Sequence, residues 1–114
     1  MTERGPGFIV LYRFRLHPGL EPSFVEAWSR RTEQLRTDGG SLGSRLHRGS
    51  DGIWYAYAQW PDEATRQRAF ARTLDPAATA QMRAATAESF PDIVLESVAD
   101  YLVLPANDGG ENLR

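Results

Sequence analysis

The chain contains neither cysteine nor lysine among its 114 residues. The lack of cysteine excludes disulfide bonds, thiolate metal sites and a cysteine nucleophile. All 13 basic residues are arginines that are scattered singly, and the formal net charge is -2, which argues against a nucleic-acid or membrane-surface partner. No run approaches the roughly 20 apolar residues of a membrane span, and residues 1–7 lack the apolar segment of a secretory signal. We therefore expect a cytoplasmic location and a small molecule or a protein as partner.

The composition is that of one globular domain, because 41% of the residues are hydrophobic and 25% are charged. We expect this domain to span residues 8–105. The segments 1–7 and 106–114, which are rich in glycine and polar residues, are expected to be flexible tails.

Alternating apolar residues predict a first strand over residues 8–16. Pro22 then suits the first turn of a helix, and the apolar residues that follow at helical spacing are Phe24, Ala27, Trp28 and Leu35. The segment Asp38-Gly39-Gly40 ends this pattern, so the sequence predicts one amphipathic helix.

The strand predicted over residues 53–60 carries bulky or apolar groups on both faces. A shorter strand over 41–48 precedes it, and the glycines at 49 and 52 indicate a hairpin between the two. In this hairpin we expect His47 and Arg45 to share a face with Trp54, Ala56 and Trp60.

Asp62 is the expected N-cap of a helix that carries Arg66 and Phe70 one turn apart. Asp75-Pro76 predicts a second helix over 77–88, and residues 93–104 are expected to form the last strand. The order strand, helix, strand, strand, helices, strand is typical of an α+β, ferredoxin-like fold, a split β-α-β antiparallel sheet with helices on one face. The other face is rich in aromatic residues, which predicts that it packs against a second copy in a homodimer.

Three segments resemble the antibiotic biosynthesis monooxygenase family of dimeric α/β barrels: Ala58-Gln59-Trp60, the helix capped by Asp62, and Asp75-Pro76 with the stretch Ala-Gln-Met-Arg at 80–83. The resemblance covers residues 8–105. It is greatest to members that need no metal or other cofactor and that oxidise tricyclic phenols to quinones. It does not extend to the haem-degrading members, because residues 8–16 contain no asparagine and residues 62–90 contain no histidine.

Residue by residue, Trp60 matches an active-site tryptophan of the cofactor-free members. Arg83 matches their active-site arginine when one short insertion is allowed before Asp75. The chain differs at two other positions, because Ala56 replaces an asparagine and Arg66 replaces a tyrosine.

Oxygenation without a cofactor requires a substrate that can itself give an electron to dioxygen, such as a deprotonated phenol. The protein then has to accept the proton, hold the anion and enclose a flat ring. We expect His47 to be the base, because it alone among the candidates titrates near neutrality, and Arg83 and Arg66 to hold the anion beside Trp60. The residues expected to bind a small hydrophobic aromatic substrate are Trp28, Arg45, Trp54, Ala56 and Phe70.

The functional hypothesis is thus a cofactor-independent monooxygenase that oxidises a polyketide-like phenol or hydroquinone. Two alternatives on the same fold stay open. One is a catalytically silent protein that holds a hydrophobic metabolite, and the other is an isomerase or cyclase whose arginines steady an enolate. Two histidines far apart in the sequence do not indicate a metal site.

Each candidate also has a structural interpretation. Trp60 is equally consistent with a core residue at the end of a sheet, Arg83 with a solvated helix residue and His47 with a surface residue near a hairpin end. Arg66 can cover the ring of Phe70. Arg31 is expected at the exposed edge of the first helix, with a ligand-facing guanidinium as the alternative. Arg13 and Arg15 are expected to pair with Glu96 or Asp100, either across neighbouring strands or across the dimer.

Overall fold

The structure is a computed structural model that describes residues 8–72 and 74–103. The expected tails at 1–7 and 106–114, and the expected domain end at 105, lie outside the described residues. The elements are β1 (Phe8–Leu16), α1 (Glu21–Asp38), β2 (Ser44–Arg48), β3 (Trp54–Trp60), α2 (Glu63–Ala71), α3 (Pro76–Ala85) and β4 (Thr86–Leu95).

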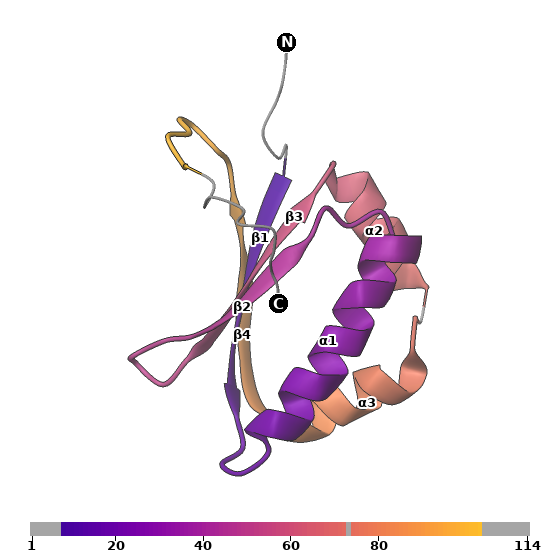
Figure 1. Ribbon diagram of the computed structural model, residues 1–114, viewed down its shortest axis with the longest axis vertical. Helices are drawn as coiled ribbons and strands as arrows, with labels where there is room; N and C mark the ends of the chain where they lie inside the picture. Colours follow the sequence, from indigo (N-terminus) through magenta and orange to yellow (C-terminus); the bar gives the residue numbers. More distant parts are fainter. Residues whose placement is uncertain (1–7, 73, 104–114) are drawn as a thin grey trace, which may run out of the picture.

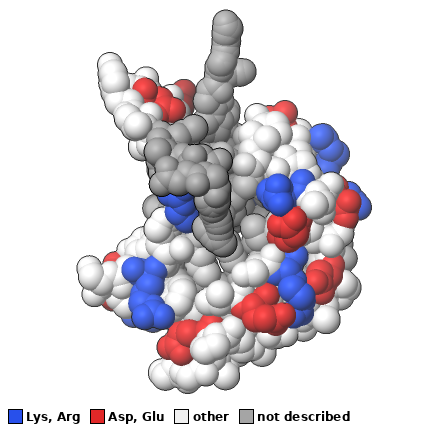
Figure 2. Space-filling view, viewed as in Figure 1, with Lys and Arg blue, Asp and Glu red and all other residues white. Residues whose placement is uncertain are grey.

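The four strands form one sheet in the order β2-β3-β1-β4, and every neighbouring pair is antiparallel. The three helices lie on the same side of this sheet (Figure 1). This arrangement confirms the predicted ferredoxin-like α+β fold. On the face drawn in Figure 2, basic and acidic side chains of the described residues are interspersed.

The helix starts follow the predicted local signals. The carboxylate of Asp62 accepts a hydrogen bond from the Thr65 backbone N–H at 2.7 Å, and that of Asp75 accepts one from the Ala78 N–H at 3.0 Å. Each aspartate satisfies one of the backbone donors that a helix leaves free in its first turn. Pro76 follows in the first turn of α3, where its missing N–H costs no hydrogen bond.

The orientation expected for Arg45 and His47 was wrong. In the observed register His47 lies opposite Tyr55, and Arg45 lies opposite Tyr57. Because residues directly opposite each other share a face, both basic side chains point away from the helices, while Trp54 faces them. A three-residue loop closes the hairpin, with the Gly49 N–H bonded to the Ile53 carbonyl at 2.7 Å, and this loop length sets the register.

The predicted boundaries near the end of the chain were also wrong. Helix α3 ends at Ala85 rather than 88, and β4 begins at Thr86 rather than 93. The cause is tertiary pairing: Thr86 lies opposite Leu16, and the His17 N–H binds the Ala85 carbonyl at 2.9 Å. Strand β2 likewise starts at Ser44, three residues later than expected.

The shift of β4 changes the partners of two arginines. Arg15 pairs with Glu88 at 3.4 Å, and a guanidinium N–H of Arg13 donates to the Pro91 carbonyl at 3.0 Å. The cross-strand pairing expected with Glu96 or Asp100 is therefore wrong, since β4 ends at Leu95 before either residue. Pairing across a dimer stays a prediction.

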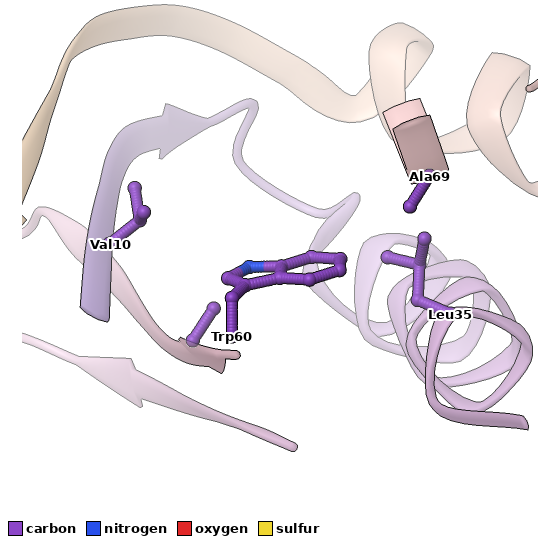
Figure 3. Close-up of a cluster of buried hydrophobic side chains, with 5 residues drawn as sticks. Val10, Leu35, Trp60 and Ala69 are labelled. Carbon is purple, nitrogen blue, oxygen red and sulfur yellow. The ribbon is translucent and has the colours of Figure 1, made fainter. Parts of the chain in front are cut away.

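Two buried clusters hold the helices on the sheet. The first consists of Val10, Leu35, Ala58, Trp60 and Ala69, and the second consists of Phe14, Phe24, Trp54, Ala56 and Ala85. In the first cluster the Trp60 ring extends from the end of β3 toward Leu35 and Ala69 on the helices (Figure 3). Tyr12 packs against both clusters, so it stands where they meet.

Candidate active site

A cavity of about 290 Å³ lies between the sheet and α1, with residues of both buried clusters in its walls. Its volume is near the lower end of the range of about 300–1,000 Å³ typical of small-molecule sites. Ala56 and Ala58 line it from β3, where they lie between Trp54 and Trp60 on the helix-facing side. These two small side chains leave the space that larger residues would fill.

The walls of the cavity are largely aromatic. The aromatic residues that line it are Tyr12, Phe14, Phe24, Trp28, Trp60, Phe70 and Phe90, from β1, α1, β3, α2 and β4. The Trp60 and Phe70 rings meet edge to face, with centroids 5.7 Å apart. Trp60 is only 1% exposed, whereas Phe70 is 37% exposed and so stands at the mouth of the cavity. A flat apolar ligand would find matching surfaces here.

A polar network reaches the cavity through Tyr12. The Arg66 guanidinium donates to the Tyr12 hydroxyl oxygen at 3.0 Å and to both carboxylate oxygens of Glu63, and its third nitrogen donates to Asp92 at 3.0 Å. The Arg66 side chain is 15% exposed and also lies 5.2 Å from the centre of the Phe70 ring, as the structural interpretation of Arg66 expected. Arg66 thus acts on the cavity through Tyr12.

The Tyr12 hydroxyl stays protonated at neutral pH. Burial raises the pKa of this phenol above its ordinary value, although the hydrogen bond and charge of Arg66 act in the opposite direction. Because Arg66 donates to its oxygen, the Tyr12 proton is available to an acceptor in the cavity.

A β-bulge brings Asp92 into this network. The pairing of β1 with β4 shifts between Leu11 and Arg13, where Pro91 and Asp92 lie opposite a single residue, Tyr12. Proline has no N–H for the ladder and is accommodated at bulges, which re-aim neighbouring side chains. Here the bulge places the Asp92 carboxylate on the cavity and against Arg66.

Besides the serine and threonine residues of the lining, two further polar groups bear on ligand binding. The indole N–H of Trp60 is buried and makes no hydrogen bond of ordinary geometry with the described residues, although it lies near enough to the Tyr12 hydroxyl to act to lower the pKa of that phenol. The half-buried Arg31 reaches the cavity from α1, with its guanidinium carbon 5.1 Å from the centre of the Phe70 ring. Burial lowers the pKa of Arg31, but a guanidinium stays charged at any physiological pH.

The structure brings together only some of the predicted site residues. Trp60, Ala56, Phe70 and Trp28 line the cavity. Arg66 contacts it through Tyr12, as described above.

Four predicted residues lie elsewhere. Arg83 is exposed on α3 and lines a neighbouring depression with Glu88, because Ala78 and Ala85 occupy the buried side of that helix. His47 and Arg45 line a third depression on the opposite face of the sheet, and Trp54 is buried in the second cluster. Their predicted roles in catalysis or binding stay predictions.

Sequence reasoning missed Tyr12 and Asp92 as site residues. Tyr12 lies within the strand predicted over residues 8–16 but was not among the predicted site residues, and Asp92 precedes the last strand as it was predicted, over 93–104. For Arg31 a signal existed, because it interrupts the apolar stripe of α1 between Trp28 and Leu35 at helical spacing. The alternative of a ligand-facing position fits its place at the cavity, and the exposed edge position was wrong.

Residues 8–72 and 74–103 contain no group of three or more histidine or acidic side chains that could hold a metal ion. In the same part of the chain, no helix has both the length and the apolar character required to cross a membrane.

Several solved structures share this fold. SnoaB, a cofactor-independent oxygenase from Streptomyces nogalater, matches with a TM-score of 0.70 and 17% identity over 85% of this chain and 98% of its own. Rv0793 from Mycobacterium tuberculosis matches with a TM-score of 0.67 and 14% identity over 83% and 98%. A conserved protein from Methanosarcina mazei matches with a TM-score of 0.69 and 9% identity over 82% and 94%. At such identities the likeness shows the fold.

A comparison with curated proteins gives no match. The family model for antibiotic biosynthesis monooxygenases, by contrast, matches residues 7–85, which is more than half of the chain and includes the strands and helices that build most of the cavity. This match agrees with the resemblance found in the sequence around Trp60 and Asp75. The chain belongs to the antibiotic biosynthesis monooxygenase family.

Proposed function

We propose that the chain is a cofactor-independent monooxygenase that oxidises an aromatic phenol or hydroquinone in the cavity between α1 and the sheet. The observation that carries this proposal is the aromatic cavity with the Trp60 and Tyr12 donors in its wall. Family membership supports it, and so does the likeness in fold to SnoaB, a cofactor-independent oxygenase.

The reaction is that of an anthrone-type substrate. Its ionised form gives an electron to dioxygen, and the two resulting radicals combine at the ring carbon opposite the phenolate oxygen. Loss of water from this adduct leaves a quinone: one oxygen atom becomes the new carbonyl, and the other leaves as water with the two hydrogens of that carbon. The protein holds the flat ring among Trp28, Trp60 and Phe70 and stabilises negative charge with the Tyr12 and Trp60 donors.

A test is dioxygen uptake by the purified, chelator-treated protein with a panel of anthrones, corrected for spontaneous oxidation. We expect uptake that depends on the protein and is unchanged by chelation. Trp60→Phe, which keeps the ring and removes the N–H, should lower turnover by about tenfold to a hundredfold, since one hydrogen-bond donor at a developing charge contributes at least that much. Trp60→Ala is a poor test, because emptying a buried tryptophan site costs about 3–5 kcal/mol of stability.

The second candidate function is a binding protein that holds a hydrophobic metabolite without changing it. The positions of the two candidate proton acceptors favour it. The cavity-lining carboxylate among the described residues, Asp92, is bonded to Arg66, and His47 lies on the other face of the sheet, so neither is free at the cavity to take a proton from the substrate. Ligand binding without protein-dependent dioxygen uptake would select this alternative.

We also propose that the protein is a homodimer. The face of the sheet away from the helices carries a row of apolar residues, Tyr57, Leu11 and Ile93, which lie opposite one another on β3, β1 and β4. Beyond β4 the chain exposes further large apolar side chains, namely Val98, Tyr101, Leu102 and Val103, each at least 86% exposed. Apolar surface of this extent favours burial against a second copy.

A further inference from the structure

Arg31 lines the cavity without a counter-charge in the described part of the chain. It is half-buried on α1 and makes neither a hydrogen bond nor an ion pair with residues 8–72 and 74–103. Arg66, which lies about as far from the same Phe70 ring, binds both Glu63 and Asp92. Arg31 does lie over the Phe70 ring, but a partly desolvated cation without a counter-charge or hydrogen bond has lost hydration that such a contact replaces only in part.

Two other polar groups of the cavity lining, like the unpaired cation of Arg31, favour an anionic ligand. The Trp60 N–H makes no hydrogen bond of ordinary geometry with the described residues, and the Tyr12 hydroxyl, which already accepts from Arg66, still has its proton to donate. The carboxylate of Asp92 is held by Arg66. The residues that line the cavity thus carry three donors, counting Arg31, and one described carboxylate that is already bonded, and such an excess of donors complements an anionic oxygen.

We propose that Arg31 binds the anionic oxygen of the ligand and makes the cavity selective for flat aromatic molecules that carry a phenolate or a carboxylate. The proposal rests on the proposed function in that it concerns the same cavity, but binding requires no oxygen chemistry. No histidine lines the cavity, so a phenol is bound after it has lost its proton to solvent. Affinity then follows the ionisation of the ligand.

The described charged and titratable groups that surround Arg31 include no histidine. From β1 these are Tyr12, whose pKa burial raises, and Arg13; from α2 they are Arg66 with its partner Glu63; from β4 it is Asp92. Carboxylates ordinarily ionise near pH 4, at about 3.9–4.3, and guanidinium groups stay charged. A pH dependence near neutrality therefore reports on the ligand.

The probe is 4-nitrophenol, whose visible absorbance reports its ionised form and which titrates near neutrality. With the full-length protein, we expect binding to strengthen as pH rises through the pKa of the phenol. The phenolate should bind at least about tenfold more tightly than the neutral form, the low end for a charge-assisted hydrogen bond. By linkage, a tenfold preference for the phenolate means that the pKa of the bound phenol lies one unit below that of the free phenol, and a larger preference lowers it further.

Arg31→Gln should remove this preference while neutral 4-nitrophenol still binds, and Arg31→Lys should keep part of it. The matched control is Arg36→Gln on the same helix, where the arginine is exposed and pairs with Glu33, and its preference should equal that of the wild type. The same preference in Arg31→Gln, or equal binding of both forms by the wild type, would overturn the proposal.

A second experiment tests whether the anionic oxygen of the ligand belongs to a phenolate or to a carboxylate. Calorimetry compares 2-naphthoate with the neutral isostere 2-naphthamide, and a preference for naphthoate that Arg31→Gln abolishes identifies a carboxylate as an acceptable anion. A preference for nitrophenolate alone identifies phenolates as the ligand class. If neither probe binds, the proposal fails. If Arg31-dependent binding occurs without dioxygen uptake by any anthrone, the monooxygenase proposal fails and this one stands.

Discussion

At the scale of single residues, the size of the cavity follows from two alanines. Ala56 and Ala58 are 3% and 5% exposed and line the cavity between two tryptophans of the same strand face. In the family resemblance, Ala56 stands where cofactor-free members have asparagine. Shortening that side chain removes a polar group and adds room, so the donors that remain, Tyr12 and Trp60, carry the polar recognition together with Arg31.

The raised pKa of Tyr12 predicts how stability depends on alkaline pH. A phenol whose pKa is higher in the folded state than in the unfolded state, about 10, contributes stability that is present below that value and is lost as pH rises through the folded pKa. We expect the wild type to lose stability above about pH 10 more steeply than Tyr12→Phe. Urea unfolding at a series of alkaline pH values checks this, and parallel curves for the two proteins would contradict it.

At the scale of elements, the start of α3 depends on one unusual residue. Asp75 has a backbone φ of 51°, in the left-handed region that aspartate and asparagine tolerate better than most residues, and its side chain caps the helix. Asp75→Ala should lower the free energy of unfolding by about 1–2 kcal/mol, because both the cap and this backbone tolerance are lost.

The conservative control is Asp75→Asn, which retains an acceptor for the Ala78 N–H and tolerates the same backbone conformation. It loses only the partly exposed ion pair with Arg30, at 3.5 Å, so its stability should stay close to that of the wild type. Urea midpoints compare the variants, and equal losses in both would show that the cap does not stabilise α3.

The elements that the sequence predicted well are those with local signals. The first strand was predicted with its observed bounds, and Pro22, Asp62 and Asp75 marked three helix starts correctly. These features depend on neighbours in the chain, and sequence spacing reports such neighbours directly.

The failures involve contacts between distant segments. The face of His47 depends on whether the hairpin loop has an odd or even number of residues, and the composition of 49–52 allows both. The segment after Ala85 has helix-forming residues, yet it pairs with β1, and Pro91 is accommodated at a bulge. For the same reason, only the structure shows that Arg31 from α1 meets the Trp60 region of β3.

At the scale of the whole molecule, the proposed dimer predicts a measurable change in mass. The wild type should elute as a dimer in light-scattering chromatography. Tyr57→Glu places a charge within the apolar row on the face of the sheet away from the helices and should shift the protein toward monomer. Arg36→Glu on the helix side is the control and should remain dimeric. A monomeric wild type at all concentrations would contradict the proposed interface.

The central claim is that this cavity transfers oxygen to an aromatic ring without a cofactor. The most direct measurement is mass spectrometry of the quinone formed from an anthrone by chelator-treated protein under isotopically labelled dioxygen. Ala58→Leu, which fills the cavity from β3, is the comparison. The account predicts one labelled oxygen atom per quinone, formed faster with the wild type than without protein and at the spontaneous rate with Ala58→Leu. Equal rates with and without the wild-type protein, or a quinone free of label, would contradict it.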